Sequence, residues 1–280
     1  MSDAVTAAMG AAISTELRDL ALVIGRDAIA LARRMRDGGI AVADTKSSAV
    51  DVVTAADRAS EELIRSHLQA VRPDDAIMGE EGEDQAGTSG VRWIVDPIDG
   101  TVNYLYGLPD WAVSIAAEID GVIVAGAVIN GSSGVEYAAA RGAGATRDGQ
   151  PIGVRPTPPL AERLVLTGFG YRSDVRAHQA ACVAALLPRV RDIRRMGSCA
   201  LDLCHVADGS GDAYVEEGPK PWDYSAGGLV LTEAGGRFGL LAGRLHQFAP
   251  GAMENALVVG APAEGWDTFV VALREAGFLT

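Results

Sequence analysis

The sequence predicts a two-lobed protein, with an α+β lobe over residues 1–155 and an α/β lobe over residues 156–280. Three observations support this fold class. Two helical segments precede a run of strand-like segments, the proline-rich stretch RPTPP marks a boundary at residues 155–159, and strands then alternate with helices. Because ligand sites commonly form between such lobes, we expect the active site there.

Two helices are expected before the first strand. Over residues 14–37 apolar side chains recur at helical spacing, and a Gly-Gly pair ends the pattern. A second helix is expected from about Thr54 to Val71. Thr54 and Asp57 have the spacing of a capping box, which favours a helix start at this point.

Over residues 76–155 the hydrophobic pattern is that of β-strands and no longer that of helices. AIMG and WIVD indicate short buried strands, while AVSIAAEI and VIVAGAVI flank an Asp-Gly pair at residues 120–121, a strong hairpin signal. A second Asp-Gly turn follows at residues 148–149. We therefore expect a largely antiparallel sheet, with the polar stretch at 82–90 as an exposed, mobile loop.

In the C-terminal part, segments with the pattern of strands alternate with segments that have the pattern of helices. Strand-like segments occur at LVLTGFG, DAYVE, RFGLLAG and ALVVGAP. Helices are expected between or after them, around residues 175–187, 198–207, 223–234 and 262–277. This alternation is typical of an α/β lobe.

The composition of the chain disfavours several classes of partner and cellular location. The chain has 280 residues, 48% of them hydrophobic, which is enough for a substantial core. A net charge of −13 disfavours binding to nucleic acid or anionic lipid unless a cation intervenes. Three cysteines without metal-ligand spacing favour a reducing compartment. The N-terminus lacks the basic region of a signal peptide and no apolar run has membrane-spanning length, so we expect a cytoplasmic protein without membrane or nucleic-acid partners.

The segment WIVDPIDGTVNY carries the strongest chemical signal. A buried strand ends in Asp96 and Asp99, and Pro97 fixes the backbone between them. Gly100 permits close approach of a ligand, whose phosphate oxygens the free backbone amides there could bind. Two rigid carboxylates at a strand end are good ligands for a hard cation such as Mg²⁺.

Each acid also has a plainer explanation. Asp96 and Asp99 could cap a turn, while Asp57 and Asp223 could stabilise helix N-termini. Other chemistries find little support, because the four histidines are scattered and no G-x-S-x-G or Walker sequence occurs. A thiol nucleophile at Cys199 has no histidine near it in sequence.

A central motif and four further motifs, in order, resemble those of the inositol monophosphatase family, over nearly the whole chain. The central one is DPIDGTVNY at residues 96–104. Residues 46–57 match the family's lysine and D-x-V-T-x-x-D element, and residues 79–81 match its G-E-E element. Downstream, WDYSAGG at 222–228 and TEAGG at 232–236 match two further elements. The resemblance implies a layered αβαβα sugar-phosphatase-like fold and a phosphatase with two to three Mg²⁺ ions.

The resemblance also implies a role for individual residues. The metal ligands would be Glu80, Asp96, Asp99, Asp223 and the backbone carbonyl of Ile98. Asp57 and Thr101 would orient the attacking water and, with Glu80, form the catalytic set. Gly100 and Thr101 would bind the phosphate, Cys199 and Glu216 would lie on the substrate side, and Lys46 and Glu81 would belong to the outer shell of a weaker metal.

The expected substrate is a small phosphate monoester. The residues after Thr101 resemble the inositol monophosphatase branch, which favours inositol 1-phosphate. Fructose 1,6-bisphosphate, histidinol phosphate and adenosine 3′,5′-bisphosphate are alternatives within the same fold. A non-catalytic interaction protein is an alternative from another class. The resemblance further implies a lithium-sensitive homodimer.

Overall fold

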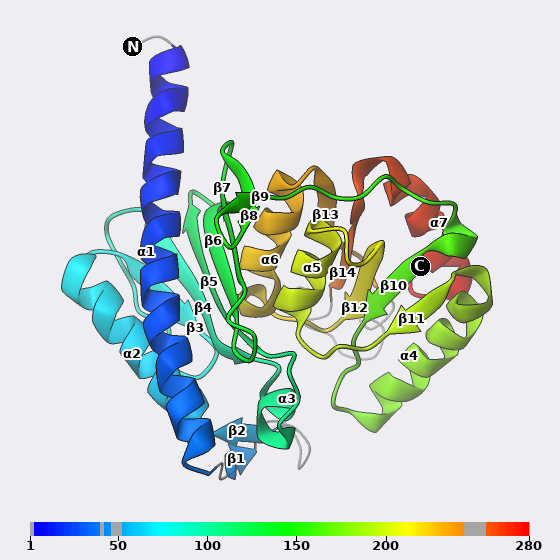
Figure 1. Ribbon diagram of the computed structural model, residues 1–280, viewed down its shortest axis with the longest axis horizontal. Helices are drawn as coiled ribbons and strands as arrows, with labels where there is room; N and C mark the ends of the chain where they lie inside the picture. Colours follow the sequence, from blue (N-terminus) through cyan, green and yellow to red (C-terminus); the bar gives the residue numbers. More distant parts are fainter. Residues whose placement is uncertain (1–2, 40–41, 46–51, 244–255, 280) are drawn as a thin grey trace.

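The computed structural model describes residues 3–39, 42–45, 52–243 and 256–279. Within them the helices are α1 (Asp3–Asp37), α2 (Ala55–Val71), α3 (Thr101–Tyr106), α4 (Ser173–Leu186), α5 (Cys199–Ala207), α6 (Pro221–Glu233) and α7 (Trp266–Ala276). α1 and α2 cover one face of a seven-stranded sheet, α5 and α6 lie between it and a five-stranded sheet, and α4 and α7 cover the far side (Figure 1). The expected layered αβαβα fold is confirmed.

The seven-stranded sheet has its strands in chain order. They are β3 (Ala76–Gly79), β4 (Val91–Asp99), β5 (Ala112–Ile119), β6 (Val122–Asn130), β7 (Glu136–Ala140), β8 (Gly144–Arg147) and β9 (Gln150–Pro151). Only the β3–β4 pair is parallel, so the expected, largely antiparallel sheet is confirmed. Both Asp-Gly hairpin turns form, with φ of 51° at Asp120 and at Asp148.

The five-stranded sheet is mixed. Its strands are β10 (Leu164–Thr167), β11 (Asp192–Arg194), β12 (Ala213–Glu217), β13 (Gly236–Leu241) and β14 (Leu257–Pro262), in the order β11-β10-β12-β14-β13. β10 is parallel to β11 and β12, whereas β14 is antiparallel to both its neighbours. The chain passes from one sheet to the other between Pro151 and Leu164. The lobe boundary at residue 155 stays a prediction.

Several expected boundaries shift. α1 begins at Asp3 rather than near residue 14, because the alanine-rich start has high helix propensity without an amphipathic pattern. α7 begins at Trp266 because strand β14 continues to Pro262 and a 3₁₀ turn over Ala263–Gly265 follows it. The short helical turn that the family resemblance implies after Gly100 is α3. A two-stranded ribbon of β1 (Val42–Thr45) and β2 (Val52–Thr54) was not predicted, since both strands are short.

The 82–90 loop is exposed as expected, but it is fastened to the body of the protein. Gln85 exchanges two backbone hydrogen bonds with Ile77, at 2.8 and 2.9 Å. The amides of Thr88 and Ser89 both donate to the carbonyl of Asp74, at 2.7 and 3.0 Å. These backbone bonds lie outside any pattern that the sequence displays. They restrain the loop, and its expected mobility stays a prediction.

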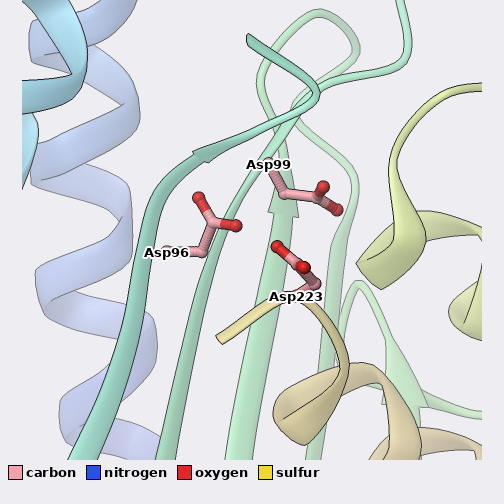
Figure 2. Close-up of side chains that lie close together, drawn as sticks. All are labelled: Asp96, Asp99 and Asp223. Carbon is pink, nitrogen blue, oxygen red and sulfur yellow. The ribbon is translucent and has the colours of Figure 1, made fainter. Parts of the chain in front are cut away.

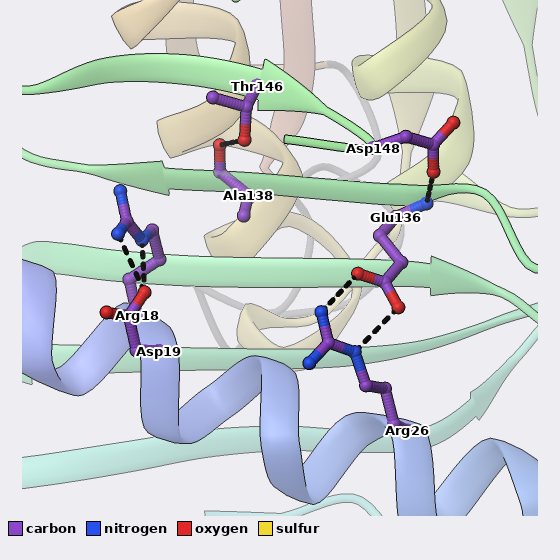
Figure 3. Close-up of polar contacts among 7 residues, drawn as sticks. All are labelled: Arg18, Asp19, Arg26, Glu136, Ala138, Thr146 and Asp148. Carbon is purple, nitrogen blue, oxygen red and sulfur yellow. Dashed lines mark hydrogen bonds and ion pairs between the residues drawn. The ribbon is translucent and has the colours of Figure 1, made fainter. Parts of the chain in front are cut away.

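The core is continuous through the first sheet. Trp93 and Ile94 on β4 are both buried, one against α1 and α2 and the other against α5 and α6. A strand that is covered on both faces has consecutive apolar residues rather than alternating ones. This accounts for the apolar residues Trp93, Ile94 and Val95 in the segment WIVD. At the rim, Arg26 of α1 donates two hydrogen bonds to the Glu136 carboxylate of β7, both at 2.7 Å (Figure 3). Among the described residues, none of the helices combines the length and apolar character that a bilayer crossing requires.

Candidate active site

An irregularity in β4 aims two carboxylates to one side. Asp96 pairs with Ser114 of β5, but Asp99 pairs with Ala112, so β4 has one extra residue between these pairs. In a regular strand, residues three apart face opposite sides of the sheet. The bulge, which contains Pro97, removes that alternation. Asp96 and Asp99 consequently point toward the same space (Figure 2).

Asp223 enters this space from the first turn of α6 (Figure 2). One carboxylate oxygen from each of Asp96, Asp99 and Asp223 lies within 4.8 Å of the others. Asp223 also accepts a hydrogen bond at 2.5 Å from the backbone amide of Lys220. The helix-cap explanation of Asp223 and the metal-ligand explanation are therefore compatible.

The acidic groups raise one another's pKa values. Burial, followed by the charges of Glu80, Asp99 and Asp223, raises the pKa of Asp96 well above its usual range. Burial and the charges of Asp99 and Glu80 do the same for the pKa of Asp223. The Oδ2 atom of Asp96 is buried and finds no hydrogen-bond partner within the described part of the chain. These oxygen donors fit a hard cation, which would satisfy that atom and neutralise the repulsion.

Asp99 is held by the start of α5. Its Oδ2 atom accepts hydrogen bonds from the Ser198 hydroxyl at 2.5 Å and from the Ala200 amide at 2.8 Å. Burial raises the pKa of Asp99 to about 6, although these bonds oppose the rise. Sequence analysis missed Ser198, and its position at the start of an expected helix was the available signal.

Asp57 lies behind Thr101. The Thr101 hydroxyl is 3.1 Å from Asp57 Oδ1 and 3.1 Å from the Ile98 carbonyl oxygen, and either can accept its hydrogen. Asp57 Oδ2 also accepts a hydrogen bond from the backbone amide of Thr54 at 2.9 Å, as the capping box requires. Asp57 therefore caps α2 and contacts the site through one carboxylate.

Gly100 makes the turn into α3. Its φ of 89° is left-handed, and an added Cβ would lie 2.9 Å from the Asp110 carbonyl oxygen and 3.0 Å from that of Gly197. Only glycine combines this conformation with this space. The turn consequently brings backbone close to the carboxylates.

The three carboxylates and Gly100 border a cavity of about 520 Å³. It draws on both sheets, and the predicted residues that line it are Glu80, Asp96, Ile98, Asp99, Gly100, Thr101, Cys199, Glu216 and Asp223. Asp57 and Glu81 do not line it, and Lys46 lies outside the described residues. Three cations that sequence analysis did not assign to the site also line it, namely Arg172, Arg195 and Lys220.

The far side of the cavity is built by β12 and α5. Glu216 accepts a hydrogen bond from the Tyr214 hydroxyl at 2.6 Å, and burial raises the pKa of Glu216 to about 7. Burial and nearby acids raise the pKa of the Cys199 thiol well above its usual range. A protonated thiol is a poor nucleophile, so Cys199 lines the wall of the cavity and is not expected to attack the substrate.

Comparison with known proteins agrees with this geometry. The inositol monophosphatase family matches residues 15–277. An inositol-1-monophosphatase of Mycobacterium bovis is 44% identical over 241 residues, covering 83% of this chain and 80% of that protein. A protein of Xylella fastidiosa called Nus factor SuhB is 42% identical over 192 residues, covering 68% and 70%. The structure of Mycobacterium tuberculosis SuhB superposes with a TM-score of 0.80 at 38% identity, covering 95% of this chain and 98% of that one.

With these matches, the layered fold and its acidic cavity define a phosphoric monoester hydrolase. Within that class, the chain belongs to the inositol monophosphatase family.

Proposed function

We propose that this protein hydrolyses inositol 1-phosphate in a reaction that requires Mg²⁺. The observation that carries the proposal is the buried Asp96, which faces Asp99, Asp223 and Glu80 without a basic partner for its Oδ2 atom among the described residues. Buried carboxylates gathered in this way need cations. An acidic protein that binds an anionic ester needs them as well.

Each residue has a proposed role. Glu80, Asp96, Asp99, Asp223 and the Ile98 carbonyl would hold the metals, of which there would be two to three. Bound Mg²⁺ would supply a nucleophilic water and stabilise the leaving oxygen. The Thr101 hydroxyl hydrogen is engaged by Asp57 or by the Ile98 carbonyl. Its oxygen would therefore accept a hydrogen bond from the attacking water and orient it.

The proposed substrate contacts use the rest of the cavity. The amides of Gly100 and Thr101 would donate to phosphate oxygens. Glu216, held by Tyr214, would accept hydrogen bonds from hydroxyl groups, as inositol requires. Lys46 and Glu81 keep the outer-shell role that the family resemblance implies, as a proposal.

Phosphate release from a panel of esters tests the proposal. With Mg²⁺, inositol 1-phosphate should give a higher kcat/KM than fructose 1,6-bisphosphate, histidinol phosphate or adenosine 3′,5′-bisphosphate. Excess EDTA should abolish release and added Mg²⁺ restore it. Full activity in EDTA would overturn the metal requirement, and preference for another ester would reassign the substrate.

Lithium provides an independent check. A labile, partly hydrated site for a small cation would accept Li⁺ in place of Mg²⁺. LiCl should therefore inhibit at saturating Mg²⁺ more strongly than equal NaCl. Equal responses to the two salts would remove the proposal of a lithium-sensitive site. The proposed homodimer rests on family resemblance, and sedimentation tests it. The proposed cytoplasmic location rests on the cysteine content and the N-terminal sequence, and cell fractionation tests it.

A second role is favoured by relatives such as the Xylella fastidiosa protein, which is called a Nus factor. We propose that an interaction role could accompany catalysis in this chain. A variant without turnover that still binds its partner would separate the two functions.

A further inference from the structure

Helix α2 contacts two chain segments of the candidate site besides carrying Asp57. One turn after its start, the Ser60 hydroxyl donates to the Pro97 carbonyl at 3.2 Å, inside the bulge between Asp96 and Asp99. The next residue, Glu61, accepts two backbone hydrogen bonds from the segment that carries Glu80. α2 therefore connects the two segments that supply carboxylates from the first sheet.

The Glu61 carboxylate is the more unusual contact. Its Oε2 atom accepts from the Glu81 amide and its Oε1 atom from the Gly82 amide, both at 2.8 Å. Glu61 is only 2% exposed. A buried carboxylate is expensive to desolvate unless partners surround it, and here Arg65 Nε donates to Oε1 at 2.7 Å. Charge-assisted bonds of this kind are stronger than those between neutral groups.

The glycines on either side of Glu80 and Glu81 fit this carboxylate. An added Cβ at Gly79 would lie 2.3 Å from Glu61 Oε1, and one at Gly82 would lie 2.7 Å from it. Neither glycine has a positive φ, so a Cβ at either position would be opposed by the Glu61 carboxylate and not by the backbone conformation. The Gly79–Gly82 turn is thus seated directly on the Glu61 carboxylate.

We infer that Glu61 is a positioning residue, which sets where Glu80 stands relative to Asp96 and Asp99. The inference rests on the proposed metal-dependent function. Glu61 does not line the cavity, so it acts only through the backbone of the turn. Groups that orient metal ligands typically change metal affinity by about 10–100-fold when they are removed.

Glu61→Gln tests this role, with Glu62→Gln as the matched control. The substitution at position 61 keeps the shape of the side chain but replaces one acceptor by a donor that faces a backbone N–H. Glu62 lies next to it on α2 and is exposed, so its variant makes the same charge change without the contacts. Two readouts are compared over a Mg²⁺ titration, namely phosphate release and the rise in melting temperature without substrate.

We expect the half-saturating Mg²⁺ concentration to rise about 10–100-fold in Glu61→Gln by both readouts, and to stay unchanged in Glu62→Gln. At saturating Mg²⁺, turnover should return toward the wild-type value. A Glu61→Gln protein that melts lower but keeps wild-type half-saturation would overturn the inference, since Glu61 would then be merely structural.

A second variant and the Mg²⁺ response of the wild type complete the test. If Glu61→Gln does not fold, Gly82→Ala displaces the carboxylate from the exposed side of the turn while leaving α2 intact. It must raise half-saturation too, and an unchanged value would overturn the inference. A wild-type protein without any Mg²⁺ response would instead overturn the proposed function, and the inference with it.

Discussion

The buried carboxylate of Asp96 has opposite effects in the metal-free protein and in a protein that holds a metal. It is 1% exposed and has acidic neighbours in Glu80, Asp99 and Asp223. Burial and repulsion both favour its protonated form, whereas a cation favours its ionised form. The side chain therefore lowers the stability of the metal-free protein while providing the charge that a metal would need.

Asp96→Asn should separate these effects. Turnover should fall by more than about 100-fold, because orienting groups alone are worth about 10–100-fold in metal sites. Without Mg²⁺ the variant should melt at a higher temperature than the wild type, because a repulsive carboxylate is removed. Asp84→Asn, in the exposed 82–90 loop, is the control and should change neither property. Turnover within tenfold of the wild type would contradict the proposed role of Asp96 as a metal ligand.

Glu216 gives a pH prediction for the metal-free protein. Burial raises its pKa from 4.5 to about 7. The folded state thus holds this proton at a pH where the unfolded chain has lost it. Its stabilising effect is complete below about pH 4.5 and is lost as pH rises through about 7, by at most about 3 kcal/mol.

Urea unfolding in EDTA at pH 5 and pH 8 measures this. The wild type should lose more free energy of unfolding than Glu216→Gln over the interval. The other buried acids whose pKa values burial raises, Asp96, Asp99, Asp202 and Asp223, are present in both proteins, so their contributions largely cancel in the difference. Equal losses in the two proteins would show that Glu216 does not titrate in this range.

At the scale of elements, α5 anchors the first sheet to the second. Ser198 caps α5 by accepting the Leu201 amide at 3.2 Å, and its hydroxyl donates to Asp99 at the end of β4. A helix N-terminus favours negative charge, so it partly offsets the burial of Asp99. One serine thus stabilises a helix and orients a carboxylate.

Ser198→Ala should affect both the stability of α5 and the orientation of the Asp99 carboxylate. Loss of the cap should lower stability by about 1 kcal/mol. Loss of the bond to Asp99 should raise the half-saturating Mg²⁺ concentration by about tenfold or more. Ser173→Ala is a suitable control, since Ser173 is exposed at the start of α4 and no cap bond involves its side chain. A stability loss with unchanged Mg²⁺ dependence would limit Ser198 to capping.

At the scale of the whole molecule, the cavity joins the two sheets. β4 and α3 line one side, and β12 and the starts of α5 and α6 line the other. A metal held by Asp96, Asp99 and Asp223 would therefore cross-link elements that are far apart in the sequence. Its binding energy would add to the stability of the complete fold rather than to one element.

Thermal unfolding should reflect this linkage. At a Mg²⁺ concentration about 100 times the dissociation constant, the wild type should gain about 2.7 kcal/mol for one site. EDTA should reverse the gain, and Asp96→Asn should show much less of it. Calorimetry with and without Mg²⁺ makes the comparison. An equal gain in Asp96→Asn would mean that Mg²⁺ stabilises the protein elsewhere.

Local features were predictable from the sequence. The capping box of α2 and the two Asp-Gly hairpins depend on contacts within a few residues, so their sequence patterns were sufficient. The DPIDGT segment identified Asp96 and Asp99, and with four other motifs it indicated the family. The backbone hydrogen bonds that fasten the 82–90 loop were not predictable, since this segment has no periodic pattern.

The sequence by itself determined the fold class, the family and the set of acidic residues, because local propensity and motif spacing are written along the chain. The family resemblance implied that Asp223 joins Asp96 and Asp99, and the tertiary structure gave their separation. Only the tertiary structure decided that Ser198 holds Asp99 and that Glu61 supports the turn after β3. These contacts join residues far apart in the sequence. Their distances depend on how the layers pack, and no local pattern specifies that packing.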